Sequence, residues 1–237
     1  MGGVFMKKGD LRRDSILRMG RELFFEKGYD ETSIQDILNA LSISKGAFYH
    51  YFDSKQALLE EICRQQSDLM IEKLRMDAAL GRLTPVQKMN MVLSQVNIFS
   101  GSDPRLNALM LKISYIDGDV NFREHIRGFM LPELGRIMGE VIREGMEDGS
   151  FFTRNPAQLG KMLLMLAYDI NDEACRMLCA DPENPDCVIL IADLLNAYRD
   201  AVENLSGATF GSVQLFDLEQ LLLSFRQTAK ELKLIAE

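Results

Sequence analysis

The chain has 237 residues, of which 47% are hydrophobic and 26% are charged, and its formal net charge is −8. This is the composition of a globular protein with enough apolar residues for a sizeable core. The sequence contains no run of about 18 apolar residues, so we expect no membrane-spanning segment and no membrane partner.

The N-terminus is amphipathic and lacks the apolar stretch and cleavage site of a signal peptide, so we expect a cytoplasmic protein. Its four cysteines are then expected to be reduced thiols. The charge is unevenly distributed, because residues 1–55 carry a net charge of +1 and residues 56–237 carry −9. The N-terminal part is therefore the part that can approach phosphate groups.

Apolar residues recur three and four positions apart along nearly the whole chain, and strand-like alternation is scarce, which predicts an all-α fold. A first helix is predicted over residues 11–27 and ends at Gly28, a residue type favoured at helix C-termini. Ser33 caps a short second helix, and Ser44 caps a third helix of about two turns. A long fourth helix begins near Lys55.

The third helix carries the residues that are most informative about function. Phe48 and Phe52 are four positions apart and therefore form its buried stripe. A helix with 3.6 residues per turn cannot also bury the three consecutive residues 49–51. At least two of these are expected to face solvent or DNA beside Lys45, which can meet a phosphate or a guanine edge. Gly46 would let this helix approach a groove closely.

We predict an N-terminal domain of residues 1–55 and a helical C-terminal domain of residues 56–237. Within the second domain, a capping residue followed by proline marks further helix starts at Pro85, Pro156 and Pro185.

Two other features of the C-terminal domain are less regular. Pro132 is expected to break or kink a helix that runs over residues 121–148. After Gly211 an amphipathic helix is predicted, and the sequence leaves open what it packs against.

Three segments of the N-terminal domain read FEKGY (residues 25–29), TSIQDI (32–37) and SISKGAFYHYFDSK (42–55). They resemble the DNA-binding signature of the TetR family of bacterial transcriptional regulators, in unbroken register through about the first sixty residues. Residues 144–151 resemble the turn that follows the seventh helix in this family. The resemblance implies an N-terminal three-helix helix-turn-helix DNA-binding domain and a C-terminal helical domain that binds a ligand and dimerises.

The function implied by the resemblance is that of a ligand-responsive repressor without a cofactor. As a homodimer it would bind a near-palindromic, double-stranded DNA operator and be released by a small-molecule inducer. Thr32 and Ser33 would touch phosphate, Lys55 would clamp another phosphate, and the third helix would enter the major groove. The DNA-contacting residues expected in this way are Thr32, Ser33, Ser44, Lys45, Gly46, Ala47, Tyr49, His50, Tyr51 and Lys55.

The resemblance also implies a four-helix dimer interface made by the helices over residues 156–180 and 185–205, which are rich in Leu, Met and Ala. The family usually binds its inducer between the middle helices of the C-terminal domain. The chain has 14 methionines, which suit an adaptable apolar pocket and equally suit an ordinary core.

We therefore expect an apolar or amphipathic effector. Asp169 and Asp172 would orient its polar groups if they face inward, although solvent exposure is the stronger expectation for Asp172. The expected lining of the effector site is Phe99, Met110, Tyr115, Met138, Met165, Tyr168 and Asp169.

Two alternatives stay open. Cys175 and Cys179 lie one helical turn apart with Cys187 beyond them, which fits a thiol- or metal-responsive regulator and also fits small buried apolar residues. A helical scaffold that binds only protein is the second alternative, but it leaves the polar face of the third helix unexplained. We do not expect an enzyme, because the chain has two histidines and lacks the G-x-S-x-G, H-E-x-x-H, P-loop and G-x-G-x-x-G motifs.

Overall fold

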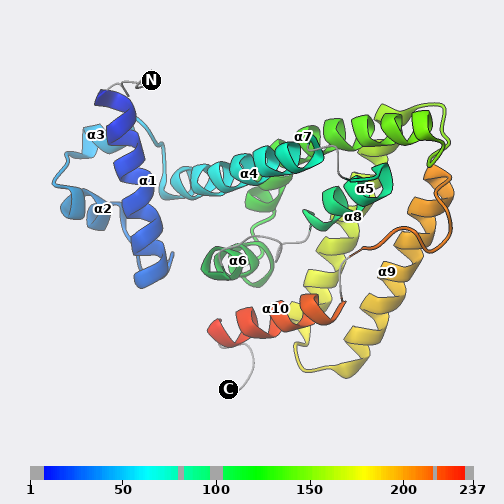
Figure 1. Ribbon diagram of the computed structural model, residues 1–237. Helices are drawn as coiled ribbons and strands as arrows, with labels where there is room; N and C mark the ends of the chain where they lie inside the picture. The colour runs from blue at the N-terminus through cyan, green and yellow to red at the C-terminus, as the bar shows by residue number, and fades with distance from the viewer. Residues whose placement is uncertain (1–7, 80–82, 97–103, 216–217, 233–237) are drawn as a thin grey trace. The chain divides into compact units, whose positions relative to one another are not determined.

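The structure is a computed structural model that describes residues 8–79, 83–96, 104–215 and 218–232. Within these ranges every regular element is a helix (Figure 1), which confirms the all-α class. None of the described helices has the length and hydropathy needed to span a membrane. The chain forms two compact units, residues 1–66 and residues 67–237.

The N-terminal unit contains three helices and the first part of a fourth, which continues into the other unit. They are α1 (Lys8–Glu26), α2 (Ile34–Leu41), α3 (Lys45–Tyr49) and α4 (Lys55–Ala79). Ser33 and Ser44 cap α2 and α3 as predicted, because each hydroxyl oxygen accepts a hydrogen bond from the backbone N–H three positions later in the chain. The caps satisfy donors that a first helical turn leaves without a partner.

One apolar core holds the N-terminal unit together. Ile16 of α1, Ile37 of α2 and Phe48 of α3 are completely buried, as is Leu58 of α4. Gly20 allows α1 and α4 to approach closely, since a Cβ at this position would lie only 2.6 Å from a methyl carbon of Leu58. The short helix α3 is therefore held on a well-packed frame.

The described residues of the C-terminal unit form six further helices and one π-helical turn, together with the end of α4. They are α5 (Pro85–Ser94), α6 (Pro104–Leu111), η1 (Lys112–Ile116), α7 (Val120–Asp148), α8 (Pro156–Ala180), α9 (Pro185–Ser206) and α10 (Leu218–Glu231). The predicted helix starts at Pro85, Pro156 and Pro185 are confirmed. Of the break or kink expected at Pro132, the break does not occur, because α7 continues through this residue.

The turn η1 follows α6 directly and was not predicted from the sequence. The N–H of Asp117 donates to the carbonyl of Lys112 over 2.8 Å, which is the five-residue spacing of a π-helix. Turns of this kind occur as single insertions in helical segments and are frequent at functional sites.

Helices α7 and α8 cross at two glycines. A Cβ on Gly160 would lie 2.7 Å from the backbone nitrogen of Gly139, so the two backbones are in direct contact. Met138 on α7 and Leu163 on α8 are fully buried close to this crossing in sequence. The crossing positions the side chains that flank it on both helices.

The helix predicted after Gly211 is α10, and the structure shows what it packs against. Phe225 and Ala229 of α10 are buried with Leu111 at the end of α6. Helices α8 and α9 complete this cluster with Ala174, Cys175, Leu178, Ile191 and Leu195. Helix α10 is therefore an integral part of the core of the C-terminal unit.

Candidate DNA interface and effector site

Helix α3 separates buried from exposed aromatic residues along consecutive positions. The hydroxyl oxygen of Ser44 accepts a hydrogen bond from the N–H of Ala47 over 3.2 Å and fixes the start of the helix. Phe48 is completely buried, whereas the neighbouring Tyr49 is 41% exposed. The two rings meet edge to face with their centroids 5.5 Å apart, so the buried ring supports the exposed one.

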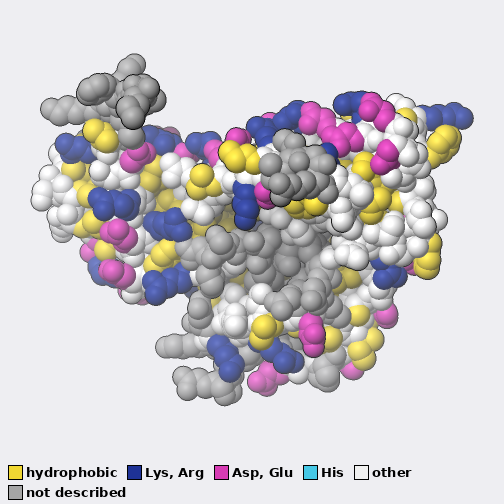
Figure 2. Space-filling model, viewed as in Figure 1, with side chains coloured by type: hydrophobic (Ala, Val, Ile, Leu, Met, Phe, Trp, Pro, Cys, Tyr) yellow, Lys and Arg dark blue, Asp and Glu magenta, His cyan; other side chains and the backbone are white. Residues whose placement is uncertain are grey.

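The predicted DNA-contacting residues differ in how accessible they are. Those exposed at the surface of the N-terminal unit are Ser33, Ser44, Lys45, Gly46, Tyr49 and His50. Ala47, Tyr51 and Lys55 are half-buried, and Thr32 is buried. The ammonium group of Lys45 lies 5.8 Å from the centre of the Tyr49 ring, so the cation and the exposed aromatic ring form one polar surface. Lys and Arg side chains stand among acidic ones on the visible face of this unit (Figure 2), which is not a uniformly basic coat.

Thr32 lies inside the N-terminal unit, although the sequence places it among the phosphate contacts. Its single hydroxyl hydrogen is shared between the carbonyl oxygens of Gly28 and Leu23, which lie 2.7 and 3.1 Å from the hydroxyl oxygen. The side chain is completely buried. The hydroxyl therefore ties the end of α1 to the start of α2 and does not reach a phosphate in this arrangement.

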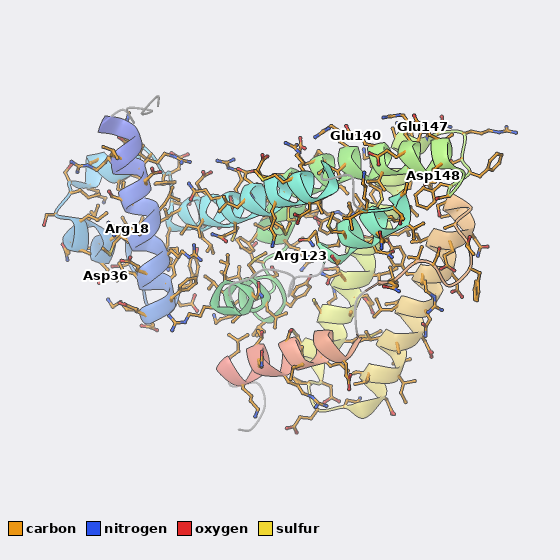
Figure 3. The ribbon with its side chains drawn as sticks, in the orientation of Figure 1. Arg18, Asp36, Arg123, Glu140, Glu147 and Asp148 are labelled. Atoms are coloured by element: carbon orange, nitrogen blue, oxygen red, sulfur yellow. The ribbon has the colours of Figure 1, made fainter. Side chains whose placement is uncertain are left out.

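The start of α2 is stabilised by a reciprocal cap between Ser33 and Asp36, and Figure 3 labels the second of these residues. The Asp36 carboxylate accepts hydrogen bonds from Lys27, at 2.8 Å, and from the hydroxyl and N–H of Ser33, at 2.7 and 2.8 Å. These hydrogen bonds hold the pKa of Asp36 well below its usual range, with Lys27 as the largest cause. The carboxylate also lies at the positive end of the helix.

The Lys55 ammonium group is engaged within the N-terminal unit. It donates to the carbonyl oxygens of Tyr29, at 2.7 Å, and Asp30, at 3.4 Å, and it lies 4.2 Å from the centre of the Tyr29 ring. This side chain thus connects the start of α4 to the turn between α1 and α2. No local sequence pattern predicts this contact, because Tyr29 and Asp30 precede Lys55 by 26 and 25 residues in the chain.

Four of the predicted effector-lining residues lie at least partly inside the C-terminal unit. They are Met110, Tyr115, Met138 and Tyr168, of which Met138 is completely buried. Phe99 lies outside the described residues. The Tyr168 hydroxyl is buried and makes no hydrogen bond to any described residue, and the Arg127 guanidinium lies 5.7 Å from the centre of its ring.

Met165 and Asp169 lie on the exposed side of α8, and this corrects their assignment to the interior. Met165 is 40% exposed, and the Asp169 side chain is 62% exposed. The reason is helical periodicity, because Leu163, Leu164 and Ala167 occupy the buried side of the same turns. Asp169 forms an ion pair with Arg127 of α7 over 2.8 Å.

Arg123 joins three elements of the C-terminal unit (Figure 3). Its guanidinium donates to the carbonyl of Ser114 in η1 over 2.9 Å and pairs with Asp172 of α8 over 3.0 Å. It also lies 5.3 Å from the centre of the Tyr115 ring. The Asp172 side chain is only 19% exposed, so the expectation that it faces solvent is wrong. Burial raises the pKa of Tyr115, which therefore stays a neutral hydrogen-bonding group.

The cysteines named in the thiol or metal alternative lie close to the end of α8 and the start of α9. Burial raises the pKa of Cys175, and it raises the pKa of Cys179 to about 11. Both thiols are therefore poorly reactive near neutral pH, because the thiolate is the reactive form. Among the described residues, no group of three or more His, Cys, Asp or Glu side chains could hold a metal ion.

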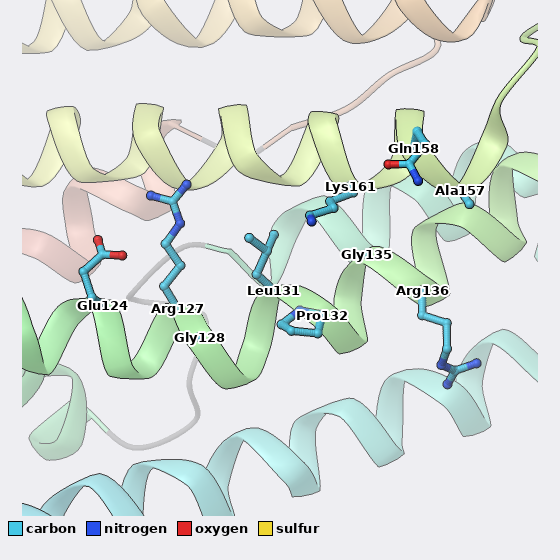
Figure 4. Close-up of a pocket in the computed structure, with 10 residues that line it drawn as sticks. All are labelled: Glu124, Arg127, Gly128, Leu131, Pro132, Gly135, Arg136, Ala157, Gln158 and Lys161. Carbon is cyan, nitrogen blue, oxygen red and sulfur yellow. The ribbon is translucent and has the colours of Figure 1, made fainter.

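A groove of about 530 Å³ lies between α7 and α8 (Figure 4). It is lined by Glu124, Arg127, Gly128, Leu131, Pro132, Gly135, Arg136, Ala157, Gln158 and Lys161. None of the residues expected to line the effector site belongs to it.

The N-terminal unit matches a family model, and longer parts of the chain match curated proteins. Residues 16–62 match the model described as bacterial regulatory proteins, tetR family. The HTH-type transcriptional repressor KstR2 of Rhodococcus jostii is 28% identical over 144 residues, which are 59% of this chain and 68% of that repressor. The Transposon Tn10 TetC protein of Escherichia coli is 43% identical over 58 residues, which are 24% of this chain and 29% of that protein.

Solved structures share the fold over most of the chain. A TetR-family transcriptional regulator of Pectobacterium atrosepticum has a TM-score of 0.61 at 18% identity, covering 84% of this chain and 96% of its own. FadR of Bacillus subtilis, solved in complex with stearoyl-CoA, has a TM-score of 0.52 at 19% identity and covers 78% and 96%. At these identities the likeness is one of fold.

Proposed function

Because the chain is a TetR-family transcriptional regulator, we propose that it acts as a dimeric repressor, which binds a near-palindromic operator and is released by a small-molecule effector. The proposed DNA-binding domain is residues 1–55, and residues 56–237 bind the effector and dimerise. The functional boundary is placed at the start of α4, whereas the compact units divide after Gln66, within α4. The site of action is the cytoplasm.

The observation that carries the DNA-binding proposal is the exposed face of α3. Lys45 and Tyr49 stand at the surface of a helix that Phe48 anchors in the core. Such a face can enter a major groove, with the lysine at a phosphate or guanine edge and the tyrosine hydroxyl at a phosphate. Gly46 adds no side chain between the helix and the DNA.

The proposed contact set is Ser33, Ser44, Lys45, Gly46, Tyr49 and His50, flanked by Ala47 and Tyr51. Thr32 and Lys55 are left out, because their polar atoms are occupied inside the unit. In a dimer, two such helices about 34 Å apart would meet successive major grooves on one side of the DNA.

The proposed dimer interface is the outer face of α8 and α9. Apolar side chains that a monomer would leave in water are exposed on both helices: Met162, Met165, Leu166, Ile189, Leu190 and Leu205. Exposed apolar patches of this kind mark interaction surfaces. Two copies of the helix pair would bury them in a four-helix bundle.

The proposed effector site lies between the helices of the C-terminal unit, with Met110, Tyr115, Met138 and Tyr168 in its wall. Thioether and aromatic side chains favour an apolar or amphipathic molecule. The buried Tyr168 hydroxyl without a partner among the described residues suits a polar group on such a molecule. FadR of Bacillus subtilis, which shares the fold, was solved with stearoyl-CoA, an amphipathic compound.

The decisive experiment replaces Tyr49 with alanine and measures binding to operator DNA selected from random fragments by the wild-type protein. We expect Tyr49→Ala to abolish a mobility shift while circular dichroism and thermal unfolding stay as in the wild type, because the side chain is exposed. Phe152→Ala is the matched control, since Phe152 is an exposed aromatic residue outside the N-terminal unit. Unchanged operator affinity of Tyr49→Ala would contradict the proposal.

A further inference from the structure

The groove between α7 and α8 is lined by both apolar and charged side chains, and Arg136 points away from α8 (Figure 4). Leu131 and Pro132 supply apolar surface, and Gly128 and Gly135 keep the groove open because they carry no side chain. Its charged residues are the cations Arg127, Arg136 and Lys161 and one acid, Glu124. The groove therefore offers an occupant both apolar surface and charged groups.

The three cations are not equally available. Arg127 is paired with Asp169 over 2.8 Å, and Arg136 is paired with Glu140 over 2.6 Å. Lys161 has no ion pair with any residue in the part of the chain that the structure describes, and its side chain points from α8 toward Leu131 in Figure 4. Lys161 is thus the cation of the groove that an acidic side chain of an occupant could meet without displacing an ion pair within the described residues.

The groove borders the exposed apolar face of α8. Lys161 precedes Met165 by four positions, and Gln158 precedes Met162 by four, so each pair lies side by side on the helix. Met162 is 52% exposed. A partner that covers this apolar face would therefore also reach the edge of the groove.

Helix α9 carries a complementary acidic edge. Asp186, Asp193 and Asp200 are seven positions apart and so follow one side of the helix. Asp193 is exposed, has no ion pair with a described residue, and lies beside the exposed Ile189 four positions earlier. The edge thus combines apolar side chains, which suit the apolar surface of the groove, with acidic ones, which suit Lys161.

The acidic edge is turned away from α8 of the same chain. The hydroxyl of Tyr198 donates to the carbonyl of Leu163 over 2.8 Å and so marks the side of α9 that faces its own α8. Asp193 lies five positions earlier, which is about 140° around the helix from Tyr198. A contact between Asp193 and the groove must therefore come from another copy of the chain.

We propose that the groove between α7 and α8 receives the acidic edge of α9 from a second copy of this chain, with Lys161 facing the partner subunit's Asp193. This inference rests on the proposed dimer through α8 and α9 and adds its electrostatic specificity. Because a two-fold axis repeats each contact, the dimer contains this contact between a groove and an acidic edge twice. Opposite charges at the edge of an apolar interface fix the register of the two copies and disfavour wrong partners.

The test is a charge reversal and its rescue, followed by sedimentation velocity over a range of protein concentrations. Lys161→Glu and Asp193→Lys should each raise the dimer dissociation constant by about tenfold at low salt, since each places two pairs of like charges in the interface. The double variant should return to within about threefold of the wild type, because the pairs are restored with opposite polarity. The effect should shrink as salt is added.

Lys230→Glu is the matched control, because it makes the same charge change at an exposed position of α10 and should leave the dissociation constant unchanged. Circular dichroism shows whether each variant is folded. If the wild type dimerises and the single variants dimerise as well as it does, the charge pairing is refuted while the proposed dimer survives. Single variants that weaken the dimer without rescue by the double variant also refute the pairing. A monomeric wild type would overturn the proposed dimer and this inference together.

Discussion

The N-terminal and C-terminal units assemble their candidate sites from residues at very different sequence separations. In the N-terminal unit, the capping Ser44, the buried Phe48 and the exposed residues of α3 all lie within residues 44–50. In the C-terminal unit, the Arg123 contacts join η1, α7 and α8, and the groove is shared between α7 and α8. A site formed by residues that are close in the chain can be recognised from the sequence. A site formed by packing of distant segments can be recognised only once the fold is known.

The comparison is tested most strongly at Phe48, which anchors α3 in the core of the N-terminal unit. Phe48→Ala removes a completely buried ring, and we expect the N-terminal unit to lose about 3–5 kcal/mol of unfolding free energy. Thermal unfolding followed by circular dichroism should show an early transition for this unit, with the C-terminal unit still folded. The adjacent Tyr49→Ala should not shift unfolding, and equal stability of the two variants would refute the assignment of one ring to the core.

In the C-terminal unit the corresponding test is the close crossing of α7 and α8. Gly160→Ala puts a Cβ against the backbone of Gly139, and we expect a loss of about 1–3 kcal/mol in the free energy of unfolding by urea. The control is Gly128→Ala, also in a helix, where an added Cβ meets nothing within 4 Å. This control should be neutral or stabilising, because alanine favours helices over glycine. Similar losses for both variants would show that the crossing is looser than described.

The smallest effect on operator affinity is expected at Lys55. The test distinguishes a lysine that holds the structure of the N-terminal unit from a lysine that contacts phosphate. Lys55→Met should lower operator affinity modestly by loosening the turn at Tyr29, and it should leave the slope of log affinity against log salt unchanged. Lys45→Met, at an exposed position, should reduce that slope by about 0.9 for each phosphate that the lysine neutralises in the wild type.

Lys55→Arg should restore affinity, because a guanidinium can also donate to both carbonyl groups. A salt slope that falls for Lys55→Met as it does for Lys45→Met would show that Lys55 contacts phosphate instead.

The features predicted from the sequence are those with local causes. The caps at Ser33 and Ser44 follow from residue types next to helical periods, and the burial of Phe48 follows from four-residue spacing with Phe52. The expectation that Met165 lines an internal site rested on residue type, and residue type does not say which face of a helix is inward. Helix α8 has apolar residues on both faces, since one packs in the core and the other is exposed.

Hydrogen bonds from side chains to particular backbone carbonyls could not be predicted. Thr32 and Lys55 have polar side chains of the kind that bind phosphate, but their partners are backbone carbonyls in the turn after α1 and at its end. A carbonyl acceptor is present at every residue, so the sequence carries no signal for it. The same holds for the contact of Arg123 with Ser114, which depends on the π-helical turn.

The cluster that joins α6 to α10 has a consequence for synthesis on the ribosome. Leu111 cannot be covered by Phe225 until α7, α8 and α9 have been translated and α10 has emerged. The N-terminal unit is complete much earlier and has short loops to close, so it can fold while translation continues. A nascent chain would then present a folded N-terminal unit, the proposed DNA-binding domain, before the core of the C-terminal unit exists.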